Sequence, residues 1–338
     1  METPATLVAA VRYFTNPDNC LNYVVARRWP EGVECPTCGR KDVRFLAKQR
    51  RWECRTKHPQ KQFSVKTKTI FEDSPLGLDK WLPAVWIIAN CKNGVSSYEI
   101  HRDLGVTQKT AWFMLHRIRE AMTDNDGQLS GPVEADEAYI GGKATSTDIN
   151  PETGKLMPTG PQENKTIVMG IVERKGRARA FVIDNTTRET LHSKIKQNVA
   201  ENSQVYTDAN ASYKKMEQLG KYTHLVINHN VQYVKGHIHT NHVENFWTLL
   251  KRTVRGTYIC PHPKHLQRYV EEQIFRFNMC DTNDAFRFSE TVRQIVGKRL
   301  TYRQLSTTVS TEQARTKEKQ RAAMLKYLTG KTCALEPS

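Results

Sequence analysis

Three acidic residues stand at positions where a carboxylate needs a chemical reason. Glu244 heads the apolar stretch "HTNHVENFWTLLKR", and Lys251 follows seven residues later. Asp136 lies inside the strand-like run 133–140, where an acidic group is costly to bury unless something pairs with it. Asp208 ends another strand-like run, and 35 residues separate it from Glu244. Glu244 is therefore either part of a solvated helix face or a metal ligand with a phosphate-binding lysine two turns away.

A second group of residues has the types and spacing of a structural zinc site. Cys35 and Cys38 form a C-x-x-C pair, and Cys54 and His58 form a second pair with three residues between them. Four such ligands in two short-range pairs suit tetrahedral zinc. Short β-type runs between and after the pairs indicate a zinc ribbon, which is too small to hold together without the ion. The alternative is unrelated cysteines beside a surface histidine, and His58 is the weakest ligand because a cysteine is more usual there.

The charge balance indicates a polyanionic partner. The 338 residues include 51 Lys and Arg against 35 Asp and Glu, a net charge of +16. Nucleic acid is the commonest partner of so basic a chain, and an anionic membrane is the rival. No long apolar run, signal peptide or lipidation motif is present, so we expect a soluble, cytoplasmic, nucleoid-associated protein (nuclear in a eukaryotic host). Three of the eight cysteines cluster at 35–54, which favours metal binding over disulfides.

The elements that must position these residues begin with a helix-turn-helix over 78–123. Ser96 and Glu99 stand at capping-box spacing and start a short helix that ends near residue 104. Gly105 makes a tight turn, and Thr107 can cap a second helix. We expect this pair to bind DNA, and a simple helical hairpin is the alternative.

The second helix combines an apolar stripe with a basic remainder. Its apolar positions recur every three or four residues: Trp112, Leu115, Ile118 and Met122. Its basic positions fall outside that stripe: Lys109, His116, Arg117 and Arg119. A helix that docks in a DNA groove has this pattern, and we expect Lys109 and Arg117 to contact DNA.

The remaining pattern predicts an α/β catalytic domain. After a composition break at 123–132, the order of elements reads β-β-β-α-β-α-β-α, with a hairpin at 175–176. This order predicts a mixed sheet flanked by helices in a ribonuclease H-like arrangement. Glu137 should point to the opposite face of its strand from Asp136. The expected organisation is a helical segment (1–28), zinc ribbon (29–71), helix-turn-helix (78–123), catalytic domain (132–280) and basic tail (281–338).

These motifs resemble a known family. Over about residues 26–277 the chain is similar to DDE transposases and retroviral integrases, and most similar to the ISXO2-like insertion-sequence group, which is related to Merlin transposons. The resemblance rests on "CPTCG", "QFSVKTKTIFEDS", "VEADEAYIGGK", "VYTDANASY" and "HTNHVENFWTLLKR". One departure is Lys68, where relatives tend to have glycine.

The resemblance implies two-metal phosphoryl transfer by Asp136, Asp208 and Glu244. Two Mg²⁺ (or Mn²⁺) ions about 4 Å apart neutralise the attacking and leaving oxygens of such a reaction. Mg²⁺ prefers oxygen ligands, so three carboxylates suffice, with Asp136 bridging both ions. Lys251 lies about 20° from Glu244 around a helix and can hold a DNA phosphate.

The resemblance also implies DNA contacts and an assembly. Arg252 and Asn241 are expected to contact double-stranded DNA, at element terminal inverted repeats and at the target. Two ends need two active sites, so we expect a homodimer or higher. Relatives carry Glu or Asn as the third active-site residue, which leaves Asn241 and Asn245 as alternatives to Glu244. A regulator derived from a transposase, and a ribonuclease H-type nuclease or resolvase, are alternative functions.

Two segments and three histidines carry weaker expectations. The stretch 141–164 is expected to be a mobile loop or hairpin beside the active site, where it would clamp DNA. The tail from Arg293 is strongly basic, with a helix expected within 311–328, and is expected to bind DNA non-specifically or to be disordered. His237, His239 and His242 are expected to make polar contacts to DNA or solvent.

Overall fold

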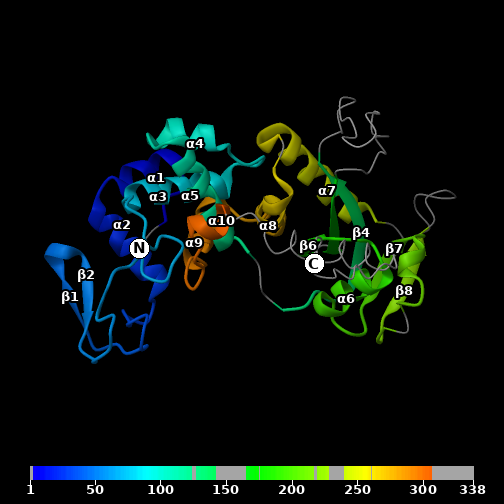
Figure 1. Ribbon diagram of the computed structural model, residues 1–338, viewed down its shortest axis with the longest axis horizontal. Coiled ribbons are helices and arrows are strands. Elements are labelled where there is room, and N and C mark those ends of the chain that lie inside the picture. The colour runs from blue at the N-terminus through cyan, green and yellow to red at the C-terminus, as the bar shows by residue number, and fades with distance from the viewer. Residues whose placement is uncertain are drawn as a thin grey trace, which may run out of the picture. The chain divides into compact units, whose positions relative to one another are not determined.

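The computed structural model describes residues 3–123, 127–141, 165–174, 176–216, 219–227, 240–259 and 261–306 (Figure 1). Contacts divide the chain into a first unit, Met1–Arg299, and a second, Leu300–Ser338, whose described part holds α10 (Tyr302–Ser306). The expected loop within 141–164, the turn residue Lys175, the first two expected polar histidines and the expected tail helix lie outside the described residues, apart from Gly141.

Four helices form the N-terminal helical group: α1 (Leu7–Phe14), α2 (Pro17–Arg28), α3 (Leu78–Asn90) and α9 (Asp284–Arg293). The side chain of Thr6 caps α1 and that of Asn16 caps α2, so the termini fall where the sequence supplies an acceptor. Every residue of α3 from Trp81 to Ala89 is buried. A helix that is apolar on all sides belongs inside a core, so α3 is the central helix of this group.

A three-stranded antiparallel ribbon packs on the same core. Its strands are β1 (Val43–Leu46), β2 (Arg51–Cys54) and β3 (Gln62–Phe63), with a 3₁₀ turn, Ala47–Gln49, after β1. Trp52 and Phe63 stack with ring centroids 6.0 Å apart, and both belong to the buried cluster that contains α1 to α3. The ribbon therefore shares a hydrophobic core with the helices.

The helices α4 (Ser97–Leu104) and α5 (Gln108–Ala121) form at the predicted residues. Both halves of the Ser96–Glu99 capping box are present, and Gly105 has φ of 61° in the left-handed region. The hydroxyl of Thr107 accepts from the Thr110 backbone N–H and begins α5. Local chemistry alone therefore sets the boundaries of this pair.

Of the four basic residues that the sequence analysis placed outside the apolar stripe of α5, Lys109 is exposed and the other three are buried. Arg117 is 4% exposed; its guanidinium donates to the Glu72 carbonyl and lies 5.6 Å from the Trp81 ring centroid. The pKa of Arg117 is lowered to about 10, chiefly by burial. Contacts from α3, α4 and α8 surround this helix, so few of its faces reach solvent.

Arg119 is buried in an ion cluster between α5 and α8 (Pro263–Asn278). Its Nε lies 2.5 Å from a Glu272 carboxylate oxygen, and both side chains are almost fully buried. Arg276 pairs with the same carboxylate, which also accepts a hydrogen bond from the Tyr258 hydroxyl. One carboxylate thus pairs with two arginines from different parts of the sequence, and its single charge balances only one of them.

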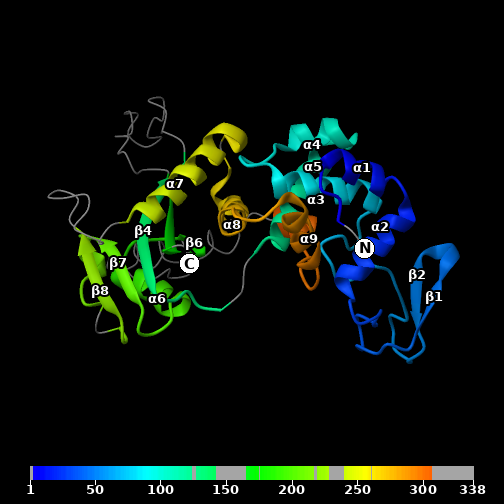
Figure 2. The same cartoon turned by 180° about the vertical axis from the view of Figure 1, so that it is seen from behind.

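The region from Pro132 to Ile227 contains a five-stranded mixed sheet of order β6-β5-β4-β7-β8. The strands are β4 (Pro132–Ile140), β5 (Thr166–Glu173), β6 (Ala178–Ile183), β7 (Gln204–Asp208) and β8 (Thr223–Ile227). β5 is antiparallel to β4 and β6, whereas β4, β7 and β8 are mutually parallel. β8 lies at the outer edge beside β7 (Figure 2).

The helix expected between β7 and β8 is wrong for the described residues, where no α-helix lies between these strands and the chain forms a 3₁₀ turn at Ala211–Tyr213. This short connection packs beneath the sheet through Tyr213 and Met216, which are buried in the same cluster. The connection therefore keeps β7 and β8 adjacent and parallel.

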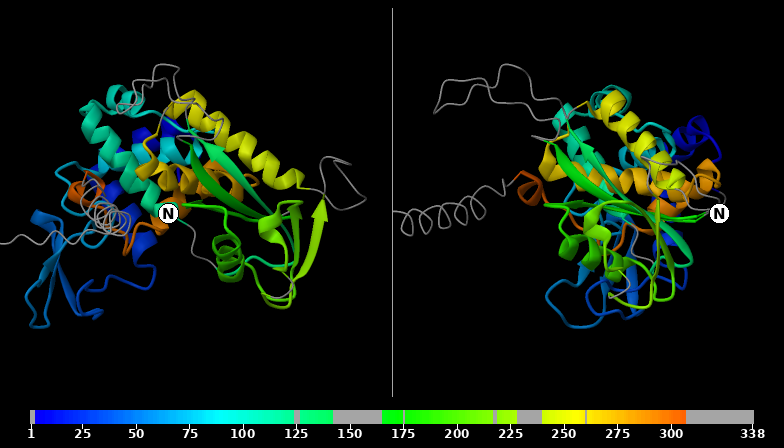
Figure 3. Two further views of the ribbon diagram at one scale, coloured as in Figure 1. Left: turned by 45° about the vertical axis from the view of Figure 1, so that its right-hand side comes forward. Right: turned by 90° about the vertical axis from the view of Figure 1, so that its right-hand side faces the viewer.

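Helices cover both faces of the sheet (Figure 3). On one face α6 (Arg188–Asn198) packs with the 3₁₀ turn. On the other lie α7 (Asn241–Thr253), which continues into a π-helical turn (Val254–Tyr258), and α8. The predicted apolar stripe of α7 is buried: Val243, Phe246, Trp247 and Leu250. Among the helices in these described ranges, none has the length and apolarity needed to cross a bilayer.

Candidate functional site

Asp136 is half-buried in β4, the central strand of the sheet. Its neighbour across the β4–β5 ladder is Gly170. The Trp247 indole N–H donates to Asp136 Oδ2 over 2.9 Å. Burial raises the pKa of Asp136, the nearby Asp208 and Glu244 raise it further, and the indole hydrogen bond opposes them.

Asp208 is the last residue of β7, the parallel neighbour of β4. The register pairs Glu134 with Tyr206, so two residues further along each strand Asp136 and Asp208 lie level with each other, where β7 ends and β4 continues. Asp208 Oδ1 accepts from the backbone N–H of Asn210 over 3.1 Å, which turns the chain directly after the strand.

Glu244 lies exposed in the first turn of α7. Its Oε1 accepts from the hydroxyl of Thr240 over 3.3 Å, and its backbone N–H donates to the Thr240 carbonyl. The carboxylate is therefore presented from a rigid helix that packs on β4 and β5. The three carboxylates lie on a strand, a strand end and a helix, as predicted, and Asp208 and Glu244 are both near enough to Asp136 to raise its pKa.

The three carboxylates offer only oxygen ligands, the donor type that Mg²⁺ and Mn²⁺ prefer. Their mutual repulsion appears in the raised pKa of Asp136, to which both neighbours contribute. A divalent cation would remove that repulsion, so the residues fit such an ion. Their oxygens are not all within 4.8 Å of one another, a spacing that in the described part of the chain only the cysteine–histidine group meets.

Glu134, to which the sequence analysis assigned no role, lies buried beside the N-terminus of α7. Its side chain is fully buried and accepts from the backbone N–H groups of His242 (2.8 Å) and Val243 (3.2 Å). It also pairs with Arg174 at 2.8 Å and lies 3.0 Å from His242 Nδ1. A carboxylate at a helix N-terminus satisfies orphan donors and the helix dipole. Glu134 thus anchors the end of α7 that carries Glu244.

Glu137 occupies the face of β4 opposite to Asp136, as predicted. Its carboxylate accepts from the hydroxyl of the buried Tyr213. Burial raises the pKa of Glu137 to about 7, although the Tyr213 hydrogen bond lowers it. Val133 and Ala135 on the same face pack in the core with Tyr213. Glu137 therefore belongs to the packing beneath the sheet.

The expected DNA contacts of α7 all lie on or near its outer face. Asn241 and Arg252 are exposed, and Lys251 is half-buried two turns beyond Glu244. Asn245, the alternative third residue, is also exposed, but its position is one residue further around the helix. A phosphate beside Glu244 would meet Lys251 on the same helical face.

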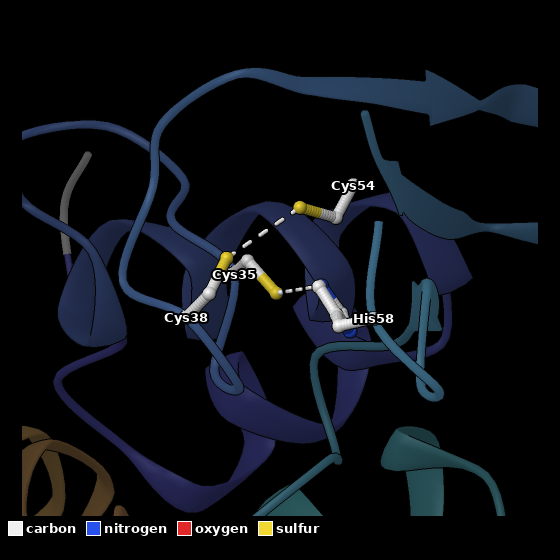
Figure 4. A group of neighbouring side chains, drawn as sticks. All are labelled: Cys35, Cys38, Cys54 and His58. Atoms are coloured by element: carbon white, nitrogen blue, oxygen red, sulfur yellow. Dashed lines mark hydrogen bonds between the residues drawn. The ribbon is translucent and has the colours of Figure 1, made fainter. Parts of the chain in front are cut away.

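The four expected zinc ligands form one cluster (Figure 4). Their ligand atoms all lie within 4.8 Å of one another. Cys35 Sγ is 3.4 Å from His58 Nε2, and Cys38 Sγ is 3.6 Å from Cys54 Sγ. Cys35 and Cys54 are buried, whereas Cys38 is exposed. Three sulfurs and one imidazole nitrogen at this spacing fit a closed tetrahedral zinc site.

Comparisons with known proteins match both regions. The family model of the ISXO2-like transposase domain matches residues 128–278, and that of the transposase zinc-ribbon domain matches residues 16–56. A protein in transposable element ISH50 of Halobacterium salinarum is 27% identical over 265 residues, 75% of this chain and 86% of the relative. A transposase-like protein of Haemophilus influenzae is 31% identical over 104 residues, 31% of this chain and 83% of the relative.

The mixed sheet with its helices, the cysteine–histidine cluster and these matches define a transposase with a DDE-type domain and a zinc ribbon. Within that class, the chain belongs to the ISXO2-like transposase family.

Proposed function

We propose that this chain is a DNA transposase that binds the terminal inverted repeats of its element, cleaves the ends and joins the freed 3′ hydroxyls to target DNA. The observation that carries the proposal is the convergence of Asp136, Asp208 and Glu244 from β4, β7 and α7. The order β6-β5-β4-β7-β8, with β5 antiparallel, supports a ribonuclease H-like core.

The reaction comprises two displacements at phosphorus. In cleavage, a water oxygen bonds to phosphorus while the bond to the 3′ oxygen of the element breaks. In joining, that 3′ hydroxyl attacks a target phosphorus and the bond to a target 3′ oxygen breaks. Two bound Mg²⁺ or Mn²⁺ ions, held by the three carboxylates, would stabilise charge on the attacking and leaving oxygens.

Other residues would bind and orient the DNA. Lys251 and Arg252 would hold phosphates next to the carboxylates, and Asn241 would contact the strand beside the first turn of α7. Glu134 would keep α7 fixed while the DNA is bound, because it holds the helix N-terminus to β4.

End recognition would involve α4, α5 and the ribbon. A short helix, a glycine turn and a longer helix match a helix-turn-helix, and exposed Lys109 stands at the start of its second helix. The basic ribbon would bind the backbone. Because each element end needs its own carboxylate site, we propose that a homodimer or larger assembly pairs the ends.

The test is strand transfer in Mg²⁺ with purified protein and pre-cleaved element ends. Asp136→Asn, Asp208→Asn and Glu244→Gln should each lower the joining rate by more than about a thousandfold, since a metal site supplies several kcal/mol of transition-state stabilisation. End binding should persist in all three variants. Asn245→Ala, one residue from Glu244, is the matched control and should lose far less.

Each alternative has its own outcome in this assay. If Glu244→Gln joins ends at the parent rate while Asn241→Ala or Asn245→Ala abolishes joining, an asparagine is the third ligand. A parent protein that binds ends without cutting or joining is a regulator. Metal-dependent cutting with no preference for element ends indicates a nuclease or resolvase.

A further inference from the structure

The Trp247 indole lies between α7 and the sheet, directly beside Asp136. Trp247 is 4% exposed, and its Nε1–H donates to Asp136 Oδ2 over 2.9 Å. The neighbouring Phe246 ring packs edge-on against it, with centroids 5.2 Å apart. Glu244 stands one turn earlier on the same helix, so a single helix presents one carboxylate and contacts a second.

Gly170 makes room for this indole. A Cβ placed on Gly170 would lie 2.7 Å from both Cη2 and Cζ2 of Trp247, and 3.3 Å from Val243 Cγ2. Gly170 is also the ladder partner of Asp136. A glycine inside an otherwise apolar strand weakens the strand and marks a close approach of another group. Here the group that approaches is the ring that holds Asp136.

We propose that Trp247 is a positioning residue for Asp136, and that the missing side chain of Gly170 leaves the space that the indole ring occupies. The inference rests on the proposed function, in which Asp136 is a metal ligand. An indole N–H is a donor only, carries no charge and cannot itself ligate a metal. It holds Oδ2 in one orientation and so fixes the direction in which the carboxylate meets a divalent ion. Groups that orient a metal ligand in this way commonly contribute ten- to a hundredfold to metal affinity.

The first experiment measures Mn²⁺ affinity of the full chain by electron paramagnetic resonance, after zinc loading. Trp247→Phe keeps an aromatic ring but removes the N–H, and should weaken Mn²⁺ binding by about tenfold or more. Trp86→Phe is the matched control, because Trp86 is 8% exposed and its Nε1 is buried without a hydrogen-bond partner in the described part of the chain. That variant should bind Mn²⁺ as the parent does.

A second readout follows the indole itself. In protein labelled with ¹⁵N at tryptophan, the N–H resonance that disappears in Trp247→Phe should shift when Mg²⁺ is added. The Trp86 resonance, assigned from its own variant, should not shift. In joining assays, Trp247→Phe should be defective at limiting Mg²⁺ and recover most of the parent rate at saturating Mg²⁺, which a merely misfolded variant would not do.

The role of Gly170 is tested by a double-mutant cycle with Trp247. Gly170→Ala in the parent should lower both the melting temperature and the Mn²⁺ affinity, because the new methyl group displaces the indole. In the Trp247→Phe background the outer ring atoms are gone. There Gly170→Ala should leave Mn²⁺ affinity unchanged and the melting temperature equal or higher.

Asp136→Asn separates failure of this inference from failure of the proposed function. If Asp136→Asn abolishes Mn²⁺ binding while Trp247→Phe binds like the parent, the positioning role is overturned and the carboxylate site stands. If Asp136→Asn binds Mn²⁺ like the parent, the carboxylate site itself is overturned. An equal effect of Gly170→Ala in both backgrounds would overturn the role of the glycine.

Discussion

At the scale of the residue, Lys68 has a backbone conformation that favours glycine. Its φ is 56°, in the left-handed region that costs a residue with a Cβ about 1 kcal/mol. Its ammonium group donates to the Pro36 carbonyl over 2.7 Å, which ties this turn to the C-x-x-C loop. At this position the lysine adds backbone strain, and its exposed hydrogen bond to Pro36 offsets part of that strain.

Substitutions at Lys68 should reverse the usual order of alanine and glycine. Lys68→Ala loses the hydrogen bond and keeps the strain, whereas Lys68→Gly loses the bond and relieves the strain. The glycine variant should be more stable by about 1 kcal/mol in urea unfolding. Lys48, in the 3₁₀ turn of the ribbon, is the control, because alanine should be the more stable replacement there. The same order at both positions would contradict the explanation.

His116 should make the stability of the protein depend on pH. It is fully buried between α5 and α8, and neither ring nitrogen has a hydrogen-bond partner in the described ranges. Burial lowers the pKa of His116 far below its usual value of 6.5, and that of neighbouring His265 to about 4. Between pH 6.5 and 4 the unfolded chain binds more protons than the folded one. The free energy of unfolding therefore has its full contribution from these neutral histidines above about pH 6.5, and it falls as the pH drops.

His116→Phe should weaken this dependence. The ring is kept and the titrating nitrogens are removed, so the urea midpoint should fall less between about pH 7.5 and about pH 5 than in the parent. Tyr269→Phe changes a ring that packs 5.5 Å from His116 without removing a group that titrates in this window, and should shift the midpoint equally at both values. An unchanged pH profile in His116→Phe would show that this histidine is not responsible.

Residue types and spacing predicted the cysteine–histidine cluster, which the structure contains, because zinc ligands carry their own chemical signature. The same reasoning predicted the three carboxylates as a site. It did not identify Glu134 or Gly170, whose roles depend on partners brought together by the fold. Glu134 meets His242 across more than a hundred residues of sequence. Gly170 inside a strand was a signal that something approaches closely, but only the structure shows that Trp247 does so.

At the scale of the element, helix boundaries were predictable because caps are local. The capping box of α4, the turn at Gly105 and the cap of α5 all act within a few residues. Which of the basic residues of α5 are exposed was not predictable. Arg117 and Arg119 look like surface residues in the sequence, yet they meet the Glu72 carbonyl and the Glu272 carboxylate at distant positions.

Because Arg117 is buried and Lys109 is exposed, substitutions at these two residues should have different effects, although the sequence predicted DNA contact for both. Lys109→Ala should weaken binding to element ends and to unrelated DNA, and should reduce the salt slope of binding by roughly one, as for a lost phosphate contact. Arg117→Met should instead lower the free energy of unfolding by about 2 kcal/mol, because it removes a buried hydrogen bond to the backbone.

Binding per folded molecule and urea unfolding, measured side by side, check this prediction. Lys109→Ala should unfold like the parent, and Arg117→Met should keep the parent salt slope. A stable Arg117→Met variant with a reduced salt slope would return Arg117 to the DNA-binding surface.

At the scale of the whole molecule, removal of zinc should affect only one part of the chain. The purified protein should contain about one equivalent of zinc, because the four ligands form a single cluster. Cys35, Cys54 and Trp52 share a core with α1 to α3, whereas the cores around the five-stranded sheet contain no ribbon residue. Chelation should therefore speed hydrogen exchange in the ribbon and adjoining helices and leave β4 to β8 protected.

Hydrogen-exchange mass spectrometry before and after chelation measures this difference, with Cys54→Ser as the genetic counterpart. Cys280, which is exposed and outside the cluster, provides the control substitution Cys280→Ser. Zinc-free native protein, with all three cluster cysteines open to thiol reagents, would refute the zinc site.

The buried pair of Arg119 and Glu272 constrains how recombination can reshape such a protein. A hybrid gene that joins the first 123 residues of this chain to a relative's catalytic region carries the arginine with it. Where the relative has no acid in place of Glu272, that arginine loses a counter-charge, and breaking a buried pair costs about 3 to 5 kcal/mol. A hybrid that keeps Arg119 therefore also needs an acid at the position of Glu272 to retain its stability.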